Sequence, residues 1–229
     1  EIDEARDVAR NKIRRQLNNR FRTGRREAEV EAYDYSFQMA EKLIRRKDLF
    51  ADFDPKELER YGSHPLGRHL LQSQRLIEAG VLFVQCHSYH WDTHGDNFNM
   101  HLDLVPQIDK PFAALVEDWN ESGLLDNVLV LLMSEFGRTP KINQRLGRDH
   151  WPEAWSLCMA GCGIQRGLVL GKTTPNGAWV DGTEYDIGDI FHTVFEAMDI
   201  DPVGTEFHNN DQPLPIAHDD CGVIKELLS

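Results

Sequence analysis

The sequence predicts an α/β protein built around a parallel sheet whose strands are buried on both faces. Two short runs, Gly80–Gln85 and Val128–Met133, consist almost entirely of apolar residues. Runs without polar alternation are typical of parallel strands that are buried on both faces. Each run follows a predicted helix and leads into a polar loop, so the order helix, strand, loop occurs twice. This order indicates βα units and therefore a parallel sheet.

The first 47 residues predict two helices and no strand. Apolar residues that recur every three or four positions lie on one face of a helix. The first helix carries Val8, Ile13, Leu17 and Phe21, and the second carries Val30, Tyr33, Phe37, Ala40 and Ile44. Thr23-Gly24 is the expected break, and the arginines on either side of it (Arg14, Arg15, Arg20, Arg22, Arg25 and Arg26) predict a solvated basic face.

Breakers mark the end of this helical region. Asp54-Pro55, Gly62 and Pro65 predict an irregular connector over residues 48–66. We therefore expect residues 1–66 to form a helical hairpin with its connector, and residues 67–229 to form the sheet domain.

The sheet domain is expected to alternate helices with further apolar runs. Its helices are predicted over residues 67–79, over residues 102–122 and from Ile187 onward. Gly80 should follow the first helix as its C′ residue. In the second helix, Pro106 should lie in the first turn and Pro111 should cause a kink. Asp186 should cap the N-terminus of the third helix. A third apolar run, Trp155–Ala160, predicts another strand. The tail from residue 202 is expected to be a loop that closes with a short helix over residues 223–228.

The composition of the chain argues against two kinds of partner, nucleic acid and the membrane interior. The chain has 229 residues and a formal net charge of −13, whereas a nucleic-acid-binding surface needs a basic stripe. No apolar run approaches the roughly 20 residues that a membrane-spanning helix needs. The dinucleotide-binding and phosphate-loop glycine motifs, the Gly-x-Ser-x-Gly elbow and zinc-finger spacings are absent from the sequence. The sequence thus predicts neither a nucleic-acid partner nor a membrane span.

Polar residues cluster beside the apolar runs. The stretch Cys86–Asn97 directly follows the first run and holds three histidines and two aspartates. Ligand sites of open α/β sheets lie at the carboxyl ends of strands, where three pairs should converge: Asp92 with His94, Glu135 with Arg138, and Asp149 with His150. Carboxylates and imidazoles in one place are suitable ligands for zinc or another divalent cation. An arginine beside them could hold an oxyanion.

Simpler interpretations remain open for individual residues. The first cluster could be a polar loop with surface histidines, and Asp149 could pair with Arg148. His87 and His90 could be ligands, could support ligands, or could do neither. His192 should be at the surface, because it falls on the polar side of its predicted helix.

Five motifs resemble a bacterial, usually exported family of unknown function, number fifteen-oh-one in that series, which is often described as sulfatase-like. They are Gly80–Val84, Trp91–Phe98, Ser134–Pro140, Gly147–Pro152 and Ala160–Gly167. The resemblance covers nearly the whole chain. This family is similar to the alkaline phosphatase superfamily. The resemblance implies a parallel-rich sheet sandwiched by helices, of which this chain would be the C-terminal half.

The resemblance also implies a two-metal site. Asp92, His94, Glu135 and His150 stand near the superfamily's ligand positions, whereas Phe136 replaces a histidine of the second metal site. Arg138 would clamp the anion. Zinc is the expected metal, with manganese, magnesium and calcium as alternatives. A missing N-terminal half of the same protein would supply the remaining ligands and the nucleophile, which is not in this chain.

Two functions follow from this resemblance. The first is a metal-dependent hydrolase of phosphate or sulfate esters, acting on a small anionic ester or a sulfated or phosphorylated glycan. The alternative is a non-catalytic, metal-stabilised binding or envelope-assembly protein on the same fold. In either case the resemblance implies a protein exported to the periplasm or the cell exterior. The truncated sheet would need its other half, or an assembly of copies, to cover its open edge and face.

Overall fold

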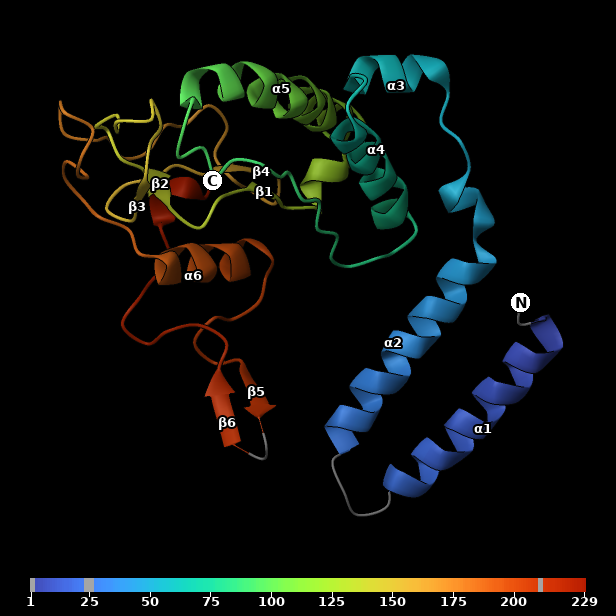
Figure 1. Ribbon diagram of the computed structural model, residues 1–229. Coiled ribbons are helices and arrows are strands. Elements are labelled where there is room, and N and C mark those ends of the chain that lie inside the picture. The colour runs from blue at the N-terminus through green and yellow to red at the C-terminus, as the bar shows by residue number, and fades with distance from the viewer. Residues whose placement is uncertain (1–2, 23–26, 210–211) are drawn as a thin grey trace. The chain divides into compact units, whose positions relative to one another are not determined.

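The structure is a computed structural model that describes residues 3–22, 27–209 and 212–229 (Figure 1). The protein is a mixed α and β protein, and its described residues form several helices and three small two-stranded sheets. Contacts divide the chain into two units. One unit comprises Glu1–Asp54 and Gln72–Val84, and the other comprises Pro55–Leu71 and Gln85–Ser229. The predicted domain division at residue 66 stays a prediction.

The first unit contains the two predicted N-terminal helices, α1 (Glu4–Arg22) and α2 (Glu27–Arg45). The expected break at Thr23-Gly24 lies outside the described residues. Ion pairs join the helices, with Arg14 Nη1 2.8 Å from Asp34 Oδ1 and Arg15 Nη2 2.8 Å from Glu41 Oε2. The prediction of a solvated basic face is wrong for Arg14, because its side chain is only 14% exposed and is neutralised by a carboxylate of α2.

The connector is more helical than the breakers predicted. It contains a 3₁₀ turn, η1 (Lys47–Phe50), and the helix α3 (Pro55–Tyr61), and α4 (Pro65–Glu78) follows. Both prolines are the first residue of a helix, where a missing N–H costs nothing and the fixed φ suits the helix. The prolines of this segment therefore begin helices and do not interrupt them.

The end of α4 confirms the prediction for Gly80. This residue has φ +88°, donates its N–H to Ile77 O at 2.8 Å, and is followed by a bond from Val81 N to Leu76 O at 3.0 Å. These two bonds form a Schellman motif, which requires a left-handed residue at C′.

The predicted strand over Gly80–Gln85 is not formed. Leu82 and Phe83 are 80% and 79% exposed, and the segment is irregular. A strand must pair its backbone groups with a neighbour, and no described segment offers this run such a ladder. Apolar composition alone therefore led to the wrong prediction.

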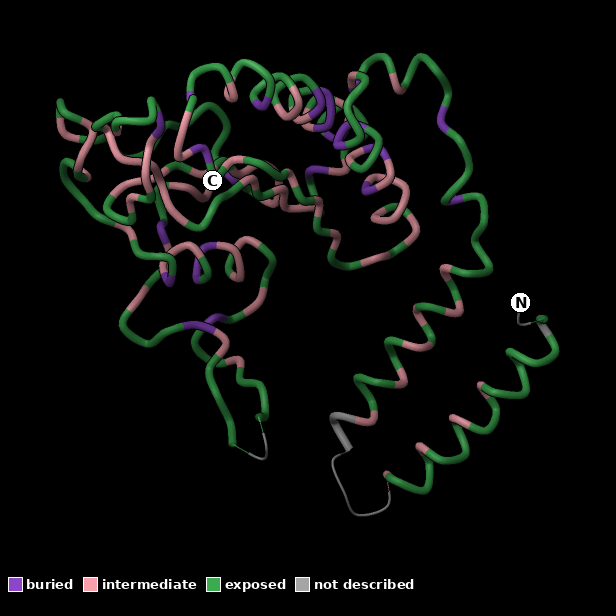
Figure 2. The backbone as a smooth tube through the Cα atoms, in the orientation of Figure 1, coloured by how far each residue is buried: buried purple, intermediate pink, exposed green. Residues whose placement is uncertain are grey.

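The long helix of the second unit is α5 (Asn97–Glu121), which begins five residues earlier than predicted. Pro106 consequently lies in the helix interior and not in its first turn. Buried positions recur along one face of α5, as Figure 2 shows, and include Leu104, Leu115 and Trp119. Gly123 lies two residues beyond the last residue of α5, has φ +74°, and directly precedes the 3₁₀ turn η2 (Leu124–Asp126).

The described strands pair only in antiparallel fashion. The pairs are β1 (Val130–Leu132) with β4 (Cys158–Ala160), β2 (Gly137–Arg138) with β3 (His150–Trp151), and β5 (Glu206–Asn209) with β6 (Gln212–Pro215). The predicted strands at Val128–Met133 and Trp155–Ala160 are thus confirmed in part, but the predicted parallel sheet is wrong for the described residues. Parallel pairing needs a crossover connection. The chain between β1 and β4 has no helix and forms the β2–β3 hairpin instead.

The C-terminal part begins with α6 (Ile187–Ala197), which carries the predicted cap. The Asp186 carboxylate accepts from Gly188 N, and the Asp189 carboxylate accepts from Asp186 N. His192 is only 3% exposed, and its Nε2 donates to His218 O at 2.7 Å, so the surface prediction for this residue is wrong. The chain end packs on this face of α6, since Ile224 N donates to Thr193 Oγ1.

The tail contains more structure than the predicted loop. The β5–β6 hairpin lies within it, and the expected closing helix is the 3₁₀ turn η3 (Lys225–Leu227). In the view of Figure 1, α5 passes on one side of the β1–β4 ribbon and α6 on the other. No helix within the described ranges is both long enough and apolar enough to cross a membrane.

Candidate metal centre

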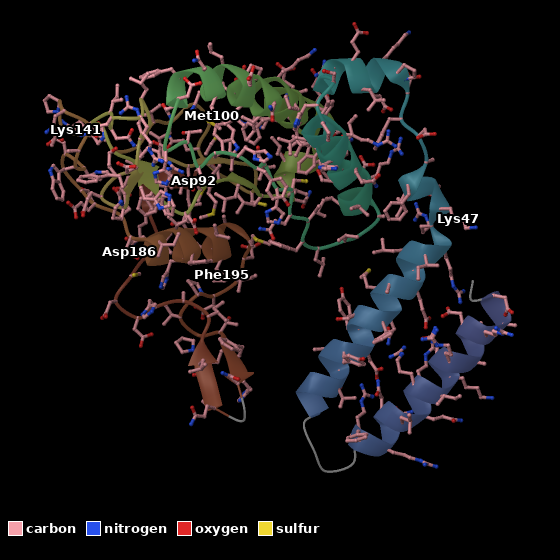
Figure 3. All side chains as sticks on the ribbon, viewed as in Figure 1. Lys47, Asp92, Met100, Lys141, Asp186 and Phe195 are labelled. Atoms are coloured by element: carbon pink, nitrogen blue, oxygen red, sulfur yellow. The ribbon has the colours of Figure 1, made fainter. Side chains whose placement is uncertain are left out.

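Three side chains converge in the second unit: Asp92 and His94 from one loop, and His150 from strand β3. Asp92 Oδ1 lies 2.7 Å from His150 Nε2 and 3.0 Å from His94 Nε2. The two Nε2 atoms lie 3.1 Å apart. This triad is the group of described residues whose ligand atoms could hold a metal ion. Asp92 is 65% exposed, His150 48% and His94 33%, so solvent reaches the triad. Figure 3 labels Asp92 among the surrounding polar side chains.

Backbone hydrogen bonds bring the first loop to the second. Asp96 N donates to Arg145 O at 3.0 Å, Asn97 N donates to Leu146 O at 3.0 Å, and Arg148 N donates to Thr93 O at 3.2 Å. Thr93 is 1% exposed and Asn97 is 6% exposed, and their side chains bond to each other. The loop that carries Asp92 and His94 is therefore anchored by buried polar groups, although it has no regular secondary structure.

Gly147 permits this close approach. A Cβ atom at this position would lie 2.0 Å from His94 C and 2.1 Å from His94 O. Real Cβ atoms do not approach backbone atoms so closely, so only glycine fits where the two loops cross.

The β2–β3 hairpin places the remaining groups. Its register sets Arg138 directly opposite His150. Arg138 Nη2 donates to Asp92 Oδ1 at 2.8 Å and to Trp91 O at 3.0 Å, and Nη1 donates to Arg148 O at 3.2 Å. The Phe136 ring packs on the His150 ring with 4.1 Å between centroids. Arg138 thus contacts Asp92, and Phe136 contacts His150, although neither residue belongs to the triad.

These contacts keep the Asp92 carboxylate ionised. The hydrogen bond from His150, followed by the hydrogen bond from Arg138, lowers the pKa of Asp92 to about 2. Asp92 therefore presents a negative charge to the two imidazoles at neutral pH.

The hydrogen-bond partners also indicate where the imidazole protons lie. His94 Nδ1 lies 2.8 Å from Asp149 Oδ1. The hydrogen bond from His94, followed by that from Asn143, lowers the pKa of Asp149, so this carboxylate is an acceptor. His94 Nδ1 must then be the donor, and a neutral His94 presents an unprotonated Nε2 to Asp92 and His150.

The separations fit a small cation. Tetrahedral zinc with bonds of about 2.0–2.1 Å holds its ligand atoms about 3.3 Å apart. The three ligand atoms here are separated by 2.7, 3.0 and 3.1 Å, so their separations would need to increase by about 0.2–0.6 Å. Two of them, Asp92 Oδ1 and His94 Nε2, are acceptors that face each other, an arrangement that a cation would stabilise.

The structure brings together some of the predicted site residues and not others. Asp92, His94 and His150 form the triad, and Arg138 contacts it. Glu135 is exposed and lies outside the triad, so its role as a ligand stays a prediction. His87 and His90 are also exposed and outside it.

Sequence reasoning placed Asp149 in the converging cluster without assigning its partner, and it missed Asn143. Asp149 bonds to His94 and not to Arg148, and Asn143 bonds to Asp149. Asp149 is adjacent to His150 in the sequence, and this was the signal for including Asp149. Asn143 had no signal, because its role depends on how the loop folds.

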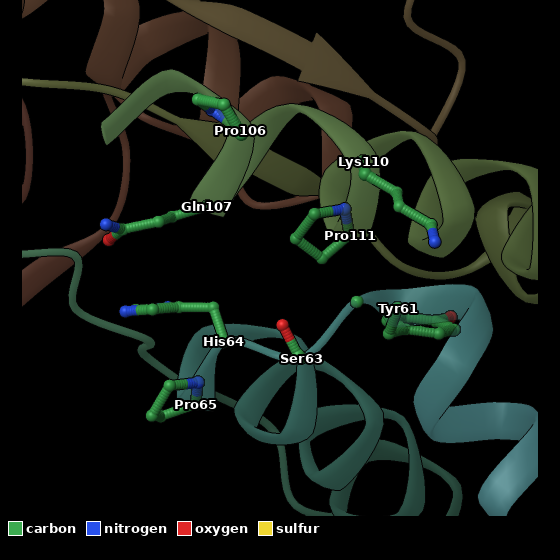
Figure 4. A pocket seen from close by; sticks show the side chains of 9 residues that line it. Tyr61, Ser63, His64, Pro65, Pro106, Gln107, Lys110 and Pro111 are labelled. Carbon is green, nitrogen blue, oxygen red and sulfur yellow. The ribbon is translucent and has the colours of Figure 1, made fainter. Parts of the chain in front are cut away.

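A separate cavity of about 500 Å³ lies where the start of α4 faces α5 (Figure 4). Ser63, His64 and Gln107 line it, and Lys110 at its edge donates to Glu59 O at 2.8 Å. None of the predicted metal ligands is among its described lining residues.

Fold and site together define a mixed α and β protein with a candidate Asp-His-His metal centre. The profile of the family described as "Protein of unknown function (DUF1501)" matches residues 1–228, and the chain therefore belongs to this family. This is the family that the sequence motifs resemble. Neither the curated proteins nor the solved structures include a match to the chain. The alkaline phosphatase-like fold therefore has no structural neighbour to support it.

Proposed function

We propose that this chain carries the metal centre of a hydrolase that acts on phosphate or sulfate esters. The observation that supports the proposal most is the convergence of Asp92 Oδ1, His94 Nε2 and His150 Nε2 within 3.1 Å of one another. The triad is open to solvent, as a site for an external substrate must be. The resemblance to sulfatase-like proteins suggests the substrate class.

Zinc is the metal that suits this donor set best. Catalytic zinc sites have three protein ligands, typically histidines with or without a carboxylate, and keep a fourth position open. Magnesium and calcium prefer sites made of oxygen ligands, whereas two of the three donors here are imidazoles. When bound, such a cation supplies a Lewis acid for an ester oxygen and favours ionisation of water.

The protein's own residues would orient the substrate. Arg138 uses three N–H contacts on Asp92, Trp91 O and Arg148 O. A guanidinium has five N–H donors. Two N–H groups of Arg138 therefore remain for an ester oxyanion, and the three contacts named above can stay in place. In this proposal Arg138 both stabilises the ionised Asp92 and contacts the anion.

Metal analysis combined with an ester panel tests this proposal. The intact protein should contain near-stoichiometric zinc and should cleave at least one aryl phosphate or aryl sulfate. Asp92→Ala and His150→Ala should each abolish both properties, because each removes one of three ligands. His87→Ala is the matched control: it removes an exposed histidine of the same stretch and should change neither. Ester cleavage that survives in both ligand variants would refute the proposal.

One observation favours a second candidate, a non-catalytic protein in which the metal stabilises a binding surface, as in an exported envelope component. Phe136 packs on His150 where a two-metal enzyme would need a further ligand, and Glu135 lies outside the triad. A single metal ion would then serve folding. Chelation distinguishes the two candidates. A structural metal predicts a large fall in the unfolding temperature and no ester cleavage in the loaded protein. A catalytic metal predicts cleavage that is restored when zinc is returned.

A further inference from the structure

We propose that Asp149 and Asn143 are positioning residues, which hold His94 in the Nδ1-protonated form so that its Nε2 lone pair faces Asp92 and His150. This inference rests on the proposed metal centre, but it concerns only residues of this chain and can be tested without metal.

The first step is the contact between Asp149 and His94. Asp149 Oδ1 lies 2.8 Å from His94 Nδ1, and both side chains are only partly exposed. A carboxylate that accepts from one ring nitrogen of histidine leaves the other nitrogen free as a ligand. His150 has no such partner on Nδ1 among the contacts of the described residues. Its Nε2 lies 2.7 Å from Asp92 Oδ1, an acceptor, so the neutral ring carries its proton on Nε2. The two histidines of the triad therefore differ: His94 is already set for a cation, whereas His150 must shift its proton to Nδ1.

The second step is the orientation of Asn143. Its Oδ1 accepts from Arg145 N at 2.9 Å and from Gly147 N at 3.0 Å, and backbone N–H groups can only donate. The amide orientation is therefore fixed, and Nδ2 must face the other way. Nδ2 donates to Asp149 Oδ1 and to His94 O, each at 3.0 Å. One side chain thus ties the loop that carries Asp149 to the backbone of His94.

The third step is the backbone of Asp149, which is held independently. Asp149 N donates to Thr139 Oγ1 at 3.1 Å, and Thr139 N donates to Asp149 O at 2.9 Å. Removing the Asp149 carboxylate should therefore leave the loop in place. The carboxylate and the loop can be tested separately for this reason.

Nitrogen NMR of the imidazoles in the metal-free protein, at a pH where they are neutral, reads this arrangement directly. Wild-type His94 should show a protonated Nδ1 and an unprotonated Nε2, and His150 the reverse. In Asp149→Ala, His94 should change to the Nε2-protonated form. Asn143→Ala should give a mixture of the two forms, and Asp149→Asn should largely keep the wild-type form, because an amide oxygen still accepts.

Zinc affinity, measured by competition with a chromophoric chelator, is the second measurement. Loss of a group that supports a metal ligand typically costs 10–100-fold in metal affinity. We expect a loss of about this size in Asp149→Ala and a smaller loss in Asp149→Asn. Asn176→Ala is the matched control: Asn176 Oδ1 also accepts two loop hydrogen bonds, from Thr174 Oγ1 and Ala178 N, but none of these residues belongs to the triad. This variant should change neither measurement.

The outcomes separate this inference from the proposed function. An Nε2-protonated His94 in the wild type, or an unchanged His94 in Asp149→Ala, overturns the positioning role whatever the metal content. If Asn143→Ala does not fold, Asp149→Ala still decides the question. The predicted tautomers in a protein that binds no zinc would support the positioning role and refute the proposed metal centre.

Discussion

Two neighbouring stretches of this chain show opposite relations between composition and burial. The apolar run Gly80–Gln85 is irregular, and its Leu82 and Phe83 are 80% and 79% exposed. The polar stretch Trp91–Asn97 contains Thr93 at 1% and Asn97 at 6% exposure, and it supplies two members of the candidate metal triad.

The difference shows that hydrogen-bond partners decide order in these loops more than hydropathy does. The polar stretch finds backbone partners at residues 145–148 and side-chain partners in Asn143, Arg138 and Asp149. The apolar run finds no strand partner among the described residues. Burying a backbone without partners costs more than leaving a few apolar side chains exposed.

The crossing of the two polar loops should be the most sensitive point of the site. In Gly147→Ala the new methyl group would meet the backbone of His94 and Gly95 at 2.0–2.4 Å. Backbone atoms cannot move aside as a flexible side chain can, so we expect a loss of about 3 kcal/mol in the free energy of unfolding, together with loss of zinc binding. Urea unfolding and zinc titration measure the two effects.

Gly222→Ala is the control for this substitution, because a Cβ at residue 222 meets nothing within 4 Å. It should change the free energy of unfolding by less than about 0.5 kcal/mol. An equally small change in Gly147→Ala would show that the two loops are not packed as described.

The sequence predicted the local structure better than the pairing of strands. The α2 periodicity, the Asp186 cap and the Gly80 C′ residue were all readable, because each depends on residues a few positions apart. The parallel sheet was wrong, because strand direction depends on the connection between β1 and β4, which apolar composition does not encode. Asp92, His94 and His150 were found from their chemical type. Asn143 was not, because its four contacts exist only once the loop 143–148 has folded against His94.

A hydrogen bond outside the candidate metal centre should have a smaller effect on the free energy of unfolding. Tyr61 is 1% exposed, and its hydroxyl donates to Asp118 Oδ2 at 2.8 Å. Asp118 keeps its ion pair with Arg60, at 2.7 Å, when the hydroxyl is removed. We therefore expect Tyr61→Phe to lower the free energy of unfolding by about 1 kcal/mol and to leave zinc affinity unchanged. Tyr89→Phe, at a 67% exposed residue, should have no measurable effect on stability.

The smallest effect should come from the exposed apolar run. Leu82→Ala should change the free energy of unfolding by less than about 0.5 kcal/mol, because the side chain is already in solvent. The matched substitution Leu71→Ala, at a residue that is 5% exposed, should cost about 2–5 kcal/mol. A cost for Leu82→Ala that approaches the cost for Leu71→Ala would show that Leu82 is covered in the folded protein, and the contrast between the two stretches would fail.

Calorimetric titration of zinc into the metal-free protein tests the central claim most directly. The wild-type protein should bind one zinc ion per chain through Asp92, His94 and His150, His87→Ala should bind it equally well, and Asp92→Ala should not bind it. Equal binding by the wild-type protein and Asp92→Ala, or no binding by the wild type, would contradict the assignment of this triad as a metal centre.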